Sequence, residues 1–196
     1  MEKFYLEKPT INRKDDVIEY IKEHIDTNSK INGTGGLNRL VKGISYEEWL
    51  DDVIKSEDIE YTKLNNFVPS STYFTIRESD NKIIGMINFR HYLNEKLSKS
   101  CGHIGYGIRP KERRKGYAKI QLYLALLVAK ELKIDKVMIS CEESNIASEK
   151  TILALNGKFD RIEYEENMKR NLKIHWINVD ESINKYQEYY KSKIKK

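Results

Sequence analysis

Apolar residues recur at helical spacing in two segments near the start of the chain. Segment 15–25 places them three or four residues apart, and the polar run 26–28 then ends the pattern. In the second segment Glu48 follows Ser45 by three residues, the signature of a capping box, and an amphipathic stretch comes next. The pattern predicts a helix over 15–25 and another from Ser45. Between them, segment 32–36 reads NGTGG, which predicts a flexible loop.

Strand-forming residues then take over. Segment 71–77 is rich in β-branched and aromatic residues, a polar turn follows at 78–81, and a second such run covers 82–92. These segments predict an antiparallel hairpin. We expect a third strand over 102–108, where the chain is rich in glycine, because Pro110 then stops the run.

The clearest helical pattern begins at Gly116 and ends at Leu132, where apolar residues form a stripe over several turns. A short apolar strand at 136–141 and a helix over 146–155 are expected next. The last expected elements are strands at 159–164 and 172–179 and a polar helix over 182–194. The order strand, helix, strand between 102 and 141 predicts a parallel crossover flanked by antiparallel hairpins. The predicted fold class is α/β of the mixed α+β kind, with a central mixed sheet flanked by helices.

Composition restricts the classes of function. The 196 residues suit one domain over 1–196. The net charge of +5 comes from dispersed lysines and not from a basic face with interleaved aromatics, so no nucleic-acid partner is expected. No apolar signal core and no run near the roughly 20 residues of a membrane span occur, so we expect a cytoplasmic protein without a membrane partner.

The two cysteines, Cys101 and Cys141, have no CxxC spacing, so no metal site is expected and both are predicted to be reduced and semi-buried. In parallel strands they would lie at opposite ends. That separation predicts that no disulfide joins them.

A basic run with one glycine lies where the third strand gives way to the clearest helix. Its residues are Arg113, Arg114, Lys115, Gly116, Tyr117 and Ala118. The first N–H groups of a helix lack internal partners and carry the positive end of its dipole, so this junction can bind an anion such as pyrophosphate. An ordinary helix start on a basic surface is the alternative interpretation.

This run resembles the Arg/Gln-x-x-Gly-x-Gly/Ala signature of the GNAT superfamily of N-acetyltransferases. Asn145 and Ser148 resemble the family's Asn-x-x-Ala/Ser pattern at the start of the next helix, and Asn156 with Gly157 resembles its usual terminator. More loosely, the chain resembles a bacterial branch of predicted acetyltransferases in segments 68–73, 90–94 and 102–110 and at Gly85. The best-supported part of the domain is 71–179, and 180–196 is expected to form a C-terminal helix and tail.

The resemblance implies a splayed sheet, with the pantetheine arm of acetyl-CoA inserted between the fourth and fifth strands. The backbone near Ile108 would hold that arm. Residues 113–118 would hold the pyrophosphate, largely through main-chain N–H groups, and Asn145 and Ser148 would lie along the cofactor's other side. Acetyl-CoA is therefore the expected acetyl donor, and direct transfer to an amine is the expected reaction.

Catalytic candidates follow from the same resemblance. Many relatives have a Glu base on the fourth strand, and the matching position here is His103, which can titrate near neutral pH; a half-buried structural histidine is the alternative. Glu142 and Glu143, beyond the fifth strand, are other candidate bases. Where many relatives have a proton-donating Tyr this chain has Ile152, so either another hydroxyl donates or the thiolate leaves without a dedicated acid. The hydroxyls that could replace it belong to Tyr106 and Tyr123.

The acceptor site is expected to form from the amino-terminal helices, the NGTGG loop and the last hairpin, which includes His175 and Trp176. We expect a small-molecule amine as the acceptor. The sequence does not distinguish a polyamine, an amino acid, an antibiotic or a protein amine, and it leaves a homodimer open. Two other functions remain open: an acyl-CoA sensor without catalysis, which Ile152 favours, and a basic nucleic-acid binder.

Overall fold

Seven β-strands within residues 2–195, the part of the chain that the computed structural model describes, form two antiparallel sheets. The four-stranded sheet, in the order β1-β2-β3-β4, contains Phe4–Glu7 (β1), Ser70–Arg77 (β2), Lys82–Arg90 (β3) and Ile104–Ile108 (β4). The three-stranded sheet, in the order β5-β7-β6, contains Lys136–Glu142 (β5), Lys158–Glu165 (β6) and Arg170–Asn178 (β7). Both predicted hairpins are confirmed, as β2–β3 and β6–β7.

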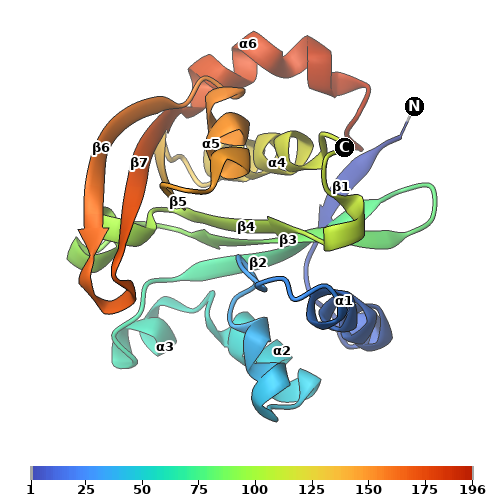
Figure 1. The fold of residues 1–196 in the computed structure, drawn as a ribbon. Coiled ribbons are helices and arrows are strands. Elements are labelled where there is room, and N and C mark those ends of the chain that lie inside the picture. Colours follow the sequence, from blue (N-terminus) through green and yellow to red (C-terminus); the bar gives the residue numbers. More distant parts are fainter. Residues whose placement is uncertain (1, 196) are drawn as a thin grey trace.

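Helices lie on both faces of the four-stranded sheet (Figure 1). One face carries Lys14–Asp26 (α1), Tyr46–Lys55 (α2) and Ile59–Leu64 (α3), and the other carries Tyr117–Glu131 (α4), Ile146–Leu153 (α5) and Val179–Lys191 (α6). The sequence pattern missed only α3 among these helices. Its apolar residues Ile59 and Leu64 remain exposed, so they form no buried stripe that periodicity could detect.

Each face of the sheet has its own hydrophobic core. Leu122, Leu126 and Ala129 of α4 are buried between the sheet and α6, and Trp49 of α2 is buried against the opposite face. The predicted capping box at the start of α2 is present: the Glu48 N–H donates to Ser45 Oγ at 3.2 Å, and the Ser45 N–H donates to Glu48 Oε2 at 2.8 Å. The mixed α+β fold class is confirmed.

The expectation of a flexible loop at 32–36 is wrong. Thr34 is 3% exposed, and the Trp49 indole N–H donates to the Thr34 and Gly35 carbonyls. A Cβ at Gly33 would lie 2.3 Å from the Tyr106 backbone nitrogen, so the glycine lets the loop pack directly on β4. The glycines serve close packing here, and the loop becomes a cover over one face of β4.

The two ends of the described chain lie side by side (Figure 1). The Phe4 N–H donates to the Lys193 carbonyl, and the Lys195 N–H donates to the Phe4 carbonyl, both at 2.9 Å. Strand β1 was not predicted from the sequence because its four residues have no periodic pattern of their own and depend on β2 and the C-terminal segment for hydrogen bonds.

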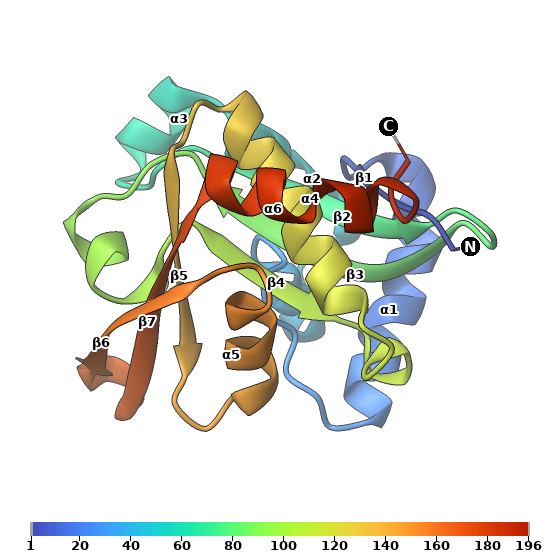
Figure 2. The same ribbon diagram turned by 90° about the horizontal axis from the view of Figure 1, so that it is seen from above.

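The predicted parallel pairing of the strands at 102–108 and 136–141 is not a ladder in the structure. β4 and β5 touch at one isolated bridge, Gly102 to Ile139, which is antiparallel, and then diverge (Figure 2). The sheet is thus splayed at this point, as the resemblance implied. A Cβ at Gly102 would lie 2.3 Å from the Met138 carbonyl oxygen, so the contact requires glycine.

Both cysteines are free thiols, but the separation argued from parallel strands is wrong. Cys101 lies beside β5, where its carbonyl accepts a hydrogen bond from Ser140 Oγ at 3.4 Å. Among the described residues, no helix has both the length and the apolar character needed to cross a membrane.

Candidate active site

Among the strands that the structure describes, none pairs with the outer edge of β4 where β5 diverges. The backbones of His103 and Arg109 hydrogen-bond to β3. Since the bonding direction alternates along an antiparallel strand, Ile104, Tyr106 and Ile108 direct their N–H groups away from β3 and toward β5. These groups line one side of the splay and are suited to pair with an extended ligand.

His103 sits at the vertex of the splay. Its N–H donates to the Met138 carbonyl at 2.8 Å, and its Nδ1 accepts the Met138 N–H at 3.0 Å. The imidazole therefore occupies the place of the next ladder bond between β4 and β5. Because the His103 side chain takes the place of a backbone acceptor, the pairing of β4 with β5 ends here and the splay begins.

The same contacts keep the His103 ring neutral. Nδ1 is an acceptor, so the ring proton is on Nε2. Burial, with the nearby Arg90 guanidinium, lowers the pKa of His103 to about 4. A ring with this pKa and an engaged Nδ1 is poorly suited to remove a proton near neutral pH, so the geometry favours a structural role at the vertex.

The basic run lies in the turn between β4 and α4. Gly116 has a φ of 84°, and a Cβ there would meet no atom within 4 Å. Within residues 2–195, the N–H groups of residues 114–118 donate to no protein acceptor. Consecutive unpaired N–H groups at the positive end of a 15-residue helix are suited to bind an anion.

The basic side chains of this turn are mostly engaged within the protein. Arg113 Nε donates to the Ile108 carbonyl at 2.9 Å and its Nη2 donates to Ser29 Oγ at 2.7 Å, while Lys115 Nζ pairs with Glu112 at 2.8 Å. The main-chain N–H groups are therefore the principal donors that this turn can offer to an anion.

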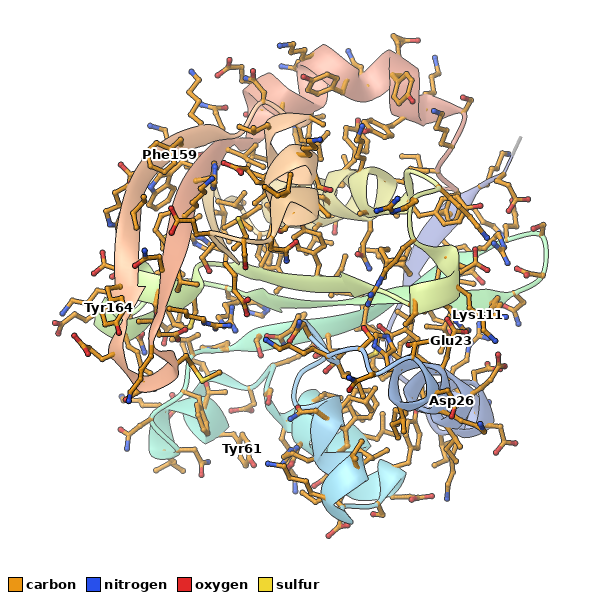
Figure 3. The ribbon with its side chains drawn as sticks, in the orientation of Figure 1. Glu23, Asp26, Tyr61, Lys111, Phe159 and Tyr164 are labelled. Carbon is orange, nitrogen blue, oxygen red and sulfur yellow. The ribbon has the colours of Figure 1, made fainter. Side chains whose placement is uncertain are left out.

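A buried carboxylate that the sequence did not single out fixes this turn from α1. Glu23 accepts two hydrogen bonds from Arg109, at 2.9 and 2.7 Å, and its other oxygen accepts the Lys111 N–H at 2.8 Å. Arg109 is 1% exposed and Glu23 6% exposed. Figure 3 shows Glu23 below Lys111 at this junction. Glu23 appeared only as a polar position in a helix, and no local signal marks it as buried.

The start of α5 faces β4 across the splay. Asn145 Oδ1 caps the helix by accepting the Ser148 N–H at 3.1 Å, and Ser148 Oγ lies 2.9 Å from the Tyr106 hydroxyl. Burial raises the pKa of Tyr106 to about 12, so the phenol stays protonated. Ile152 is fully buried in the core, and the Tyr123 ring stacks on Tyr190. Of the two hydroxyls considered above, only that of Tyr106 reaches the splay.

Glu142 joins three elements at the end of β5. Its Oε1 accepts from Lys30 Nζ at 3.3 Å and from Arg170 of β7. Burial raises the pKa of Glu142, but Lys30 and Arg170 outweigh it and hold that pKa below its ordinary value. Glu143 accepts from Asn171 Nδ2 at 3.0 Å.

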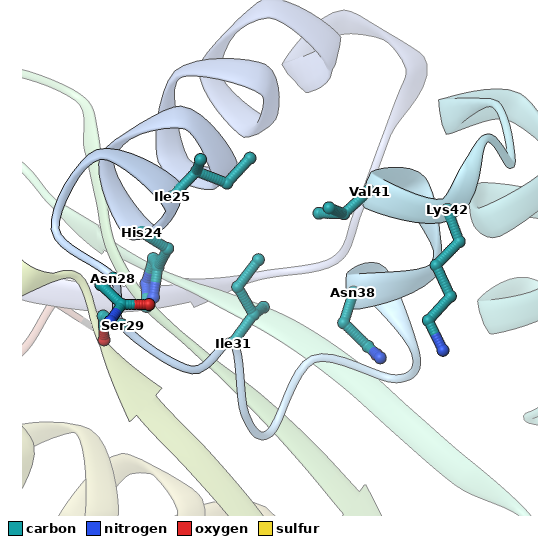
Figure 4. A pocket seen from close by; sticks show the side chains of 8 residues that line it. All are labelled: His24, Ile25, Asn28, Ser29, Ile31, Asn38, Val41 and Lys42. Carbon is teal, nitrogen blue, oxygen red and sulfur yellow. The ribbon is translucent and has the colours of Figure 1, made fainter.

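His175 and Trp176 of β7, which the sequence analysis assigned to the acceptor site, lie in different surroundings. His175 is fully buried, and its ring packs edge-on against Phe159, whereas the Trp176 ring packs against His103. Neighbouring strand residues point to opposite faces, so the two cannot line one site. A cavity of about 390 Å³ lies instead between the end of α1 and Leu37–Lys42 (Figure 4). Its lining includes Ser29, which accepts from Arg113.

A splayed sheet whose open strand edge leads to unpaired N–H groups at a helix start could hold an extended ligand that ends in a phosphate, as an acyl-CoA-dependent transferase requires. A family model described as "Acetyltransferase (GNAT) domain" matches residues 43–157, and the chain belongs to this family. The protein is thus an N-acetyltransferase, and acetyl-CoA is the donor that its family uses. No match was found among curated proteins.

Solved structures show the same fold at low sequence identity. RimJ from Mycobacterium smegmatis, in complex with CoA-disulfide, has a TM-score of 0.68 at 10% identity, over 95% of this chain and 88% of that one. Ribosomal-protein-S5-alanine acetyltransferase from Vibrio fischeri gives 0.65 at 14% identity, over 92% and 95%. A putative phosphinothricin N-acetyltransferase gives 0.57 at 14% identity, over 90% and 98%.

Proposed function

We propose that this protein transfers an acetyl group directly from acetyl-CoA to the amine of a small molecule. The observation that carries the proposal is the continuity between the open edge of β4 and the unpaired N–H groups at the start of α4. A pantetheine arm bound along the open edge of β4 would bring the pyrophosphate of the cofactor to the N–H groups at the start of α4.

The residues present suit the cofactor. The N–H groups of residues 114–118, including those of Gly116, Tyr117 and Ala118, would hold the pyrophosphate, with Arg113 and Lys115 supporting the turn. Ile108 would bind the pantetheine arm through its backbone. Asn145 uses Oδ1 for its cap, which leaves its amide N–H₂ to donate to the arm beside Ser148.

Bound acetyl-CoA supplies a thioester that an amine can attack. The Ile104 or Tyr106 N–H would donate to the thioester oxygen as it gains charge. The Tyr106 hydroxyl, which stays protonated with a pKa of about 12, would donate a proton to the departing sulfur in place of the missing tyrosine at 152.

Glu142 remains a better candidate proton acceptor than His103, because His103 holds the vertex of the splay. The lowered pKa of Glu142 makes it a weak base. Its carboxylate would attract the acceptor's ammonium group and pass the proton to water.

A small acceptor is favoured by the cover over β4. The NGTGG loop contacts the β4 backbone so closely that a Cβ at Gly33 would overlap Tyr106. A folded protein surface would not fit there. Two of the solved structures above are named as a ribosomal-protein-S5-alanine acetyltransferase and a putative phosphinothricin N-acetyltransferase, so an amine of a protein is the competing acceptor. We further propose that the chain works as one domain, since α1 and β7 complete a site that the family match over 43–157 only partly spans.

The test is thermal unfolding with and without acetyl-CoA, followed by release of the CoA thiol with a panel of amines. A ligand that binds the folded state alone must raise the unfolding temperature. We expect an upward shift and turnover with at least one small amine. A shift without turnover would favour the acyl-CoA sensor, which would not need the tyrosine that Ile152 replaces. No shift at saturating acetyl-CoA would overturn the cofactor site.

A further inference from the structure

We propose that Arg90 binds a carboxylate of the acceptor, so that the substrates are amines of the amino acid class. This inference rests on the proposed function and adds the chemical group by which the acceptor is recognised. Its basis is that the Arg90 guanidinium has no carboxylate partner among residues 2–195 and lies beside the vertex of the splay.

Poorly exposed arginines elsewhere in the molecule are neutralised by carboxylates. Arg13 pairs with Glu7 and Asp16, Arg77 pairs with Glu2, Asp80 and Glu112, and Arg109 pairs with Glu19 and Glu23, so each of the three arginines has at least two carboxylate partners. Arg90 pairs with no carboxylate among residues 2–195. Within the same residues, the single hydrogen bond of its guanidinium runs from Nη1 to the Gly102 carbonyl at 3.0 Å.

This arrangement costs stability. Arg90 is half-buried, this burial lowers the pKa of its guanidinium, and the His103 ring beside it is neutral. A desolvated charge without a counterion is unfavourable, and a bound anion would relieve that penalty. One guanidinium N–H is used, so enough donors remain in the planar fork to bind both oxygens of a carboxylate.

The position of Arg90 fits the reacting end of the site. Its N–H donates to the His103 carbonyl, which places the residue in β3 directly beside the vertex. The open edge of β4 runs from Ile108, next to the pyrophosphate turn, to Ile104, next to that vertex. An arm laid along this edge from the turn would end near Arg90.

The side chain also lies on the face from which the acceptor would come. Arg90 alternates along β3 with Phe89, which faces the α4 core, and therefore shares the face of Asn88, which borders the NGTGG loop. An amine with a nearby carboxylate could present nitrogen to the thioester while the guanidinium holds its carboxylate.

The experiment compares each α-amino acid with its carboxamide as acceptor, with kcat/KM measured from release of the CoA thiol by the full chain. The wild type should prefer the acids. Arg90→Gln should lower kcat/KM for the acids by roughly 10- to 100-fold, the usual effect of losing charge-assisted hydrogen bonds, and leave the amides unchanged. Arg161→Gln is the matched control: Arg161 is paired with Asp160 and Glu163 on β6, and its variant should keep the wild-type ratio.

Equal use of acids and amides by the wild type, an unchanged ratio in Arg90→Gln, or no transfer to any amino acid would each overturn the assignment. If Arg90→Gln fails to fold, the wild-type ratio of kcat/KM for acid and carboxamide still tests the proposal. Stabilisation by acetyl-CoA should be the same in Arg90→Gln and wild type. Its absence in the wild type would remove the proposed function instead, so the two failures are distinguishable.

Discussion

Gly116 has a left-handed backbone with open space where a side chain would be, in the middle of the proposed pyrophosphate turn. Gly116→Glu should therefore fold, with a strain cost of about 1 kcal/mol, but its carboxylate would repel the phosphates. We expect the thermal shift with acetyl-CoA to disappear. Calorimetric titration of the variant with CoA checks the loss of binding directly.

Gly43 supplies the control for this substitution. It also has a positive φ, 98°, and no atom within 4 Å of a built Cβ, but it follows Leu37–Lys42, away from the turn. Gly43→Glu should carry the same strain and charge and still bind acetyl-CoA. Binding retained by both variants would contradict the placement of the pyrophosphate.

At the scale of elements, α1 holds the proposed cofactor turn through Glu23. Glu23→Gln would leave Arg109 buried with one exposed partner, Glu19, and weaken the hold on the Lys111 N–H. Breaking a buried pair costs roughly 3–5 kcal/mol of unfolding free energy. Because the turn loosens as well, we expect acetyl-CoA affinity to fall about tenfold or more.

Glu19→Gln is the matched variant, since Glu19 bonds to the same Arg109 but is 61% exposed. Glu19→Gln should change neither the unfolding free energy nor the acetyl-CoA affinity by much. Urea unfolding and calorimetric titration of both variants make the comparison. A Glu23→Gln protein that is less stable but binds acetyl-CoA as the wild type does would show that the pair supports the fold alone.

For the whole molecule, the histidines predict how stability depends on pH. Burial lowers the pKa of His24, His91, His103 and His175, and that of His103 falls to about 4. The folded state therefore binds fewer protons than the unfolded state between the unfolded pKa of about 6.5 and the folded values. The stabilisation is present above about pH 6.5 and is lost as the pH falls toward 4.

Urea unfolding at several pH values from 7 to 4.5 measures this loss. We expect the unfolding free energy to fall steadily over that range. His103→Gln should reduce the slope, because the amide oxygen can accept the Met138 N–H but does not titrate. Carboxylates such as Glu23, with pKa values below the ordinary range, add to the loss at lower pH. A flat profile between pH 6.5 and 5 would contradict the prediction.

The sequence alone determined most of the secondary structure and the place of the turn between β4 and α4 that we propose as the cofactor site. Helical and strand periodicity, the Ser45 capping box and the glycine before α4 are local features, because each depends on residues a few positions apart. The GNAT-like signature at 113–118 is local in the same sense, so the sequence alone is enough to recognise it.

Tertiary structure decided the features that join distant segments. Glu23 and Arg109 are 86 positions apart, and Met138 lies 35 positions from His103, so no pattern along the chain reveals either contact. The glycine-rich loop suggested flexibility because its composition does not show what packs on it. The charge of Arg90 was evident in the sequence, but that no carboxylate within residues 2–195 pairs with it follows only from how β3 and β4 meet, because burial and pairing are properties of the folded chain.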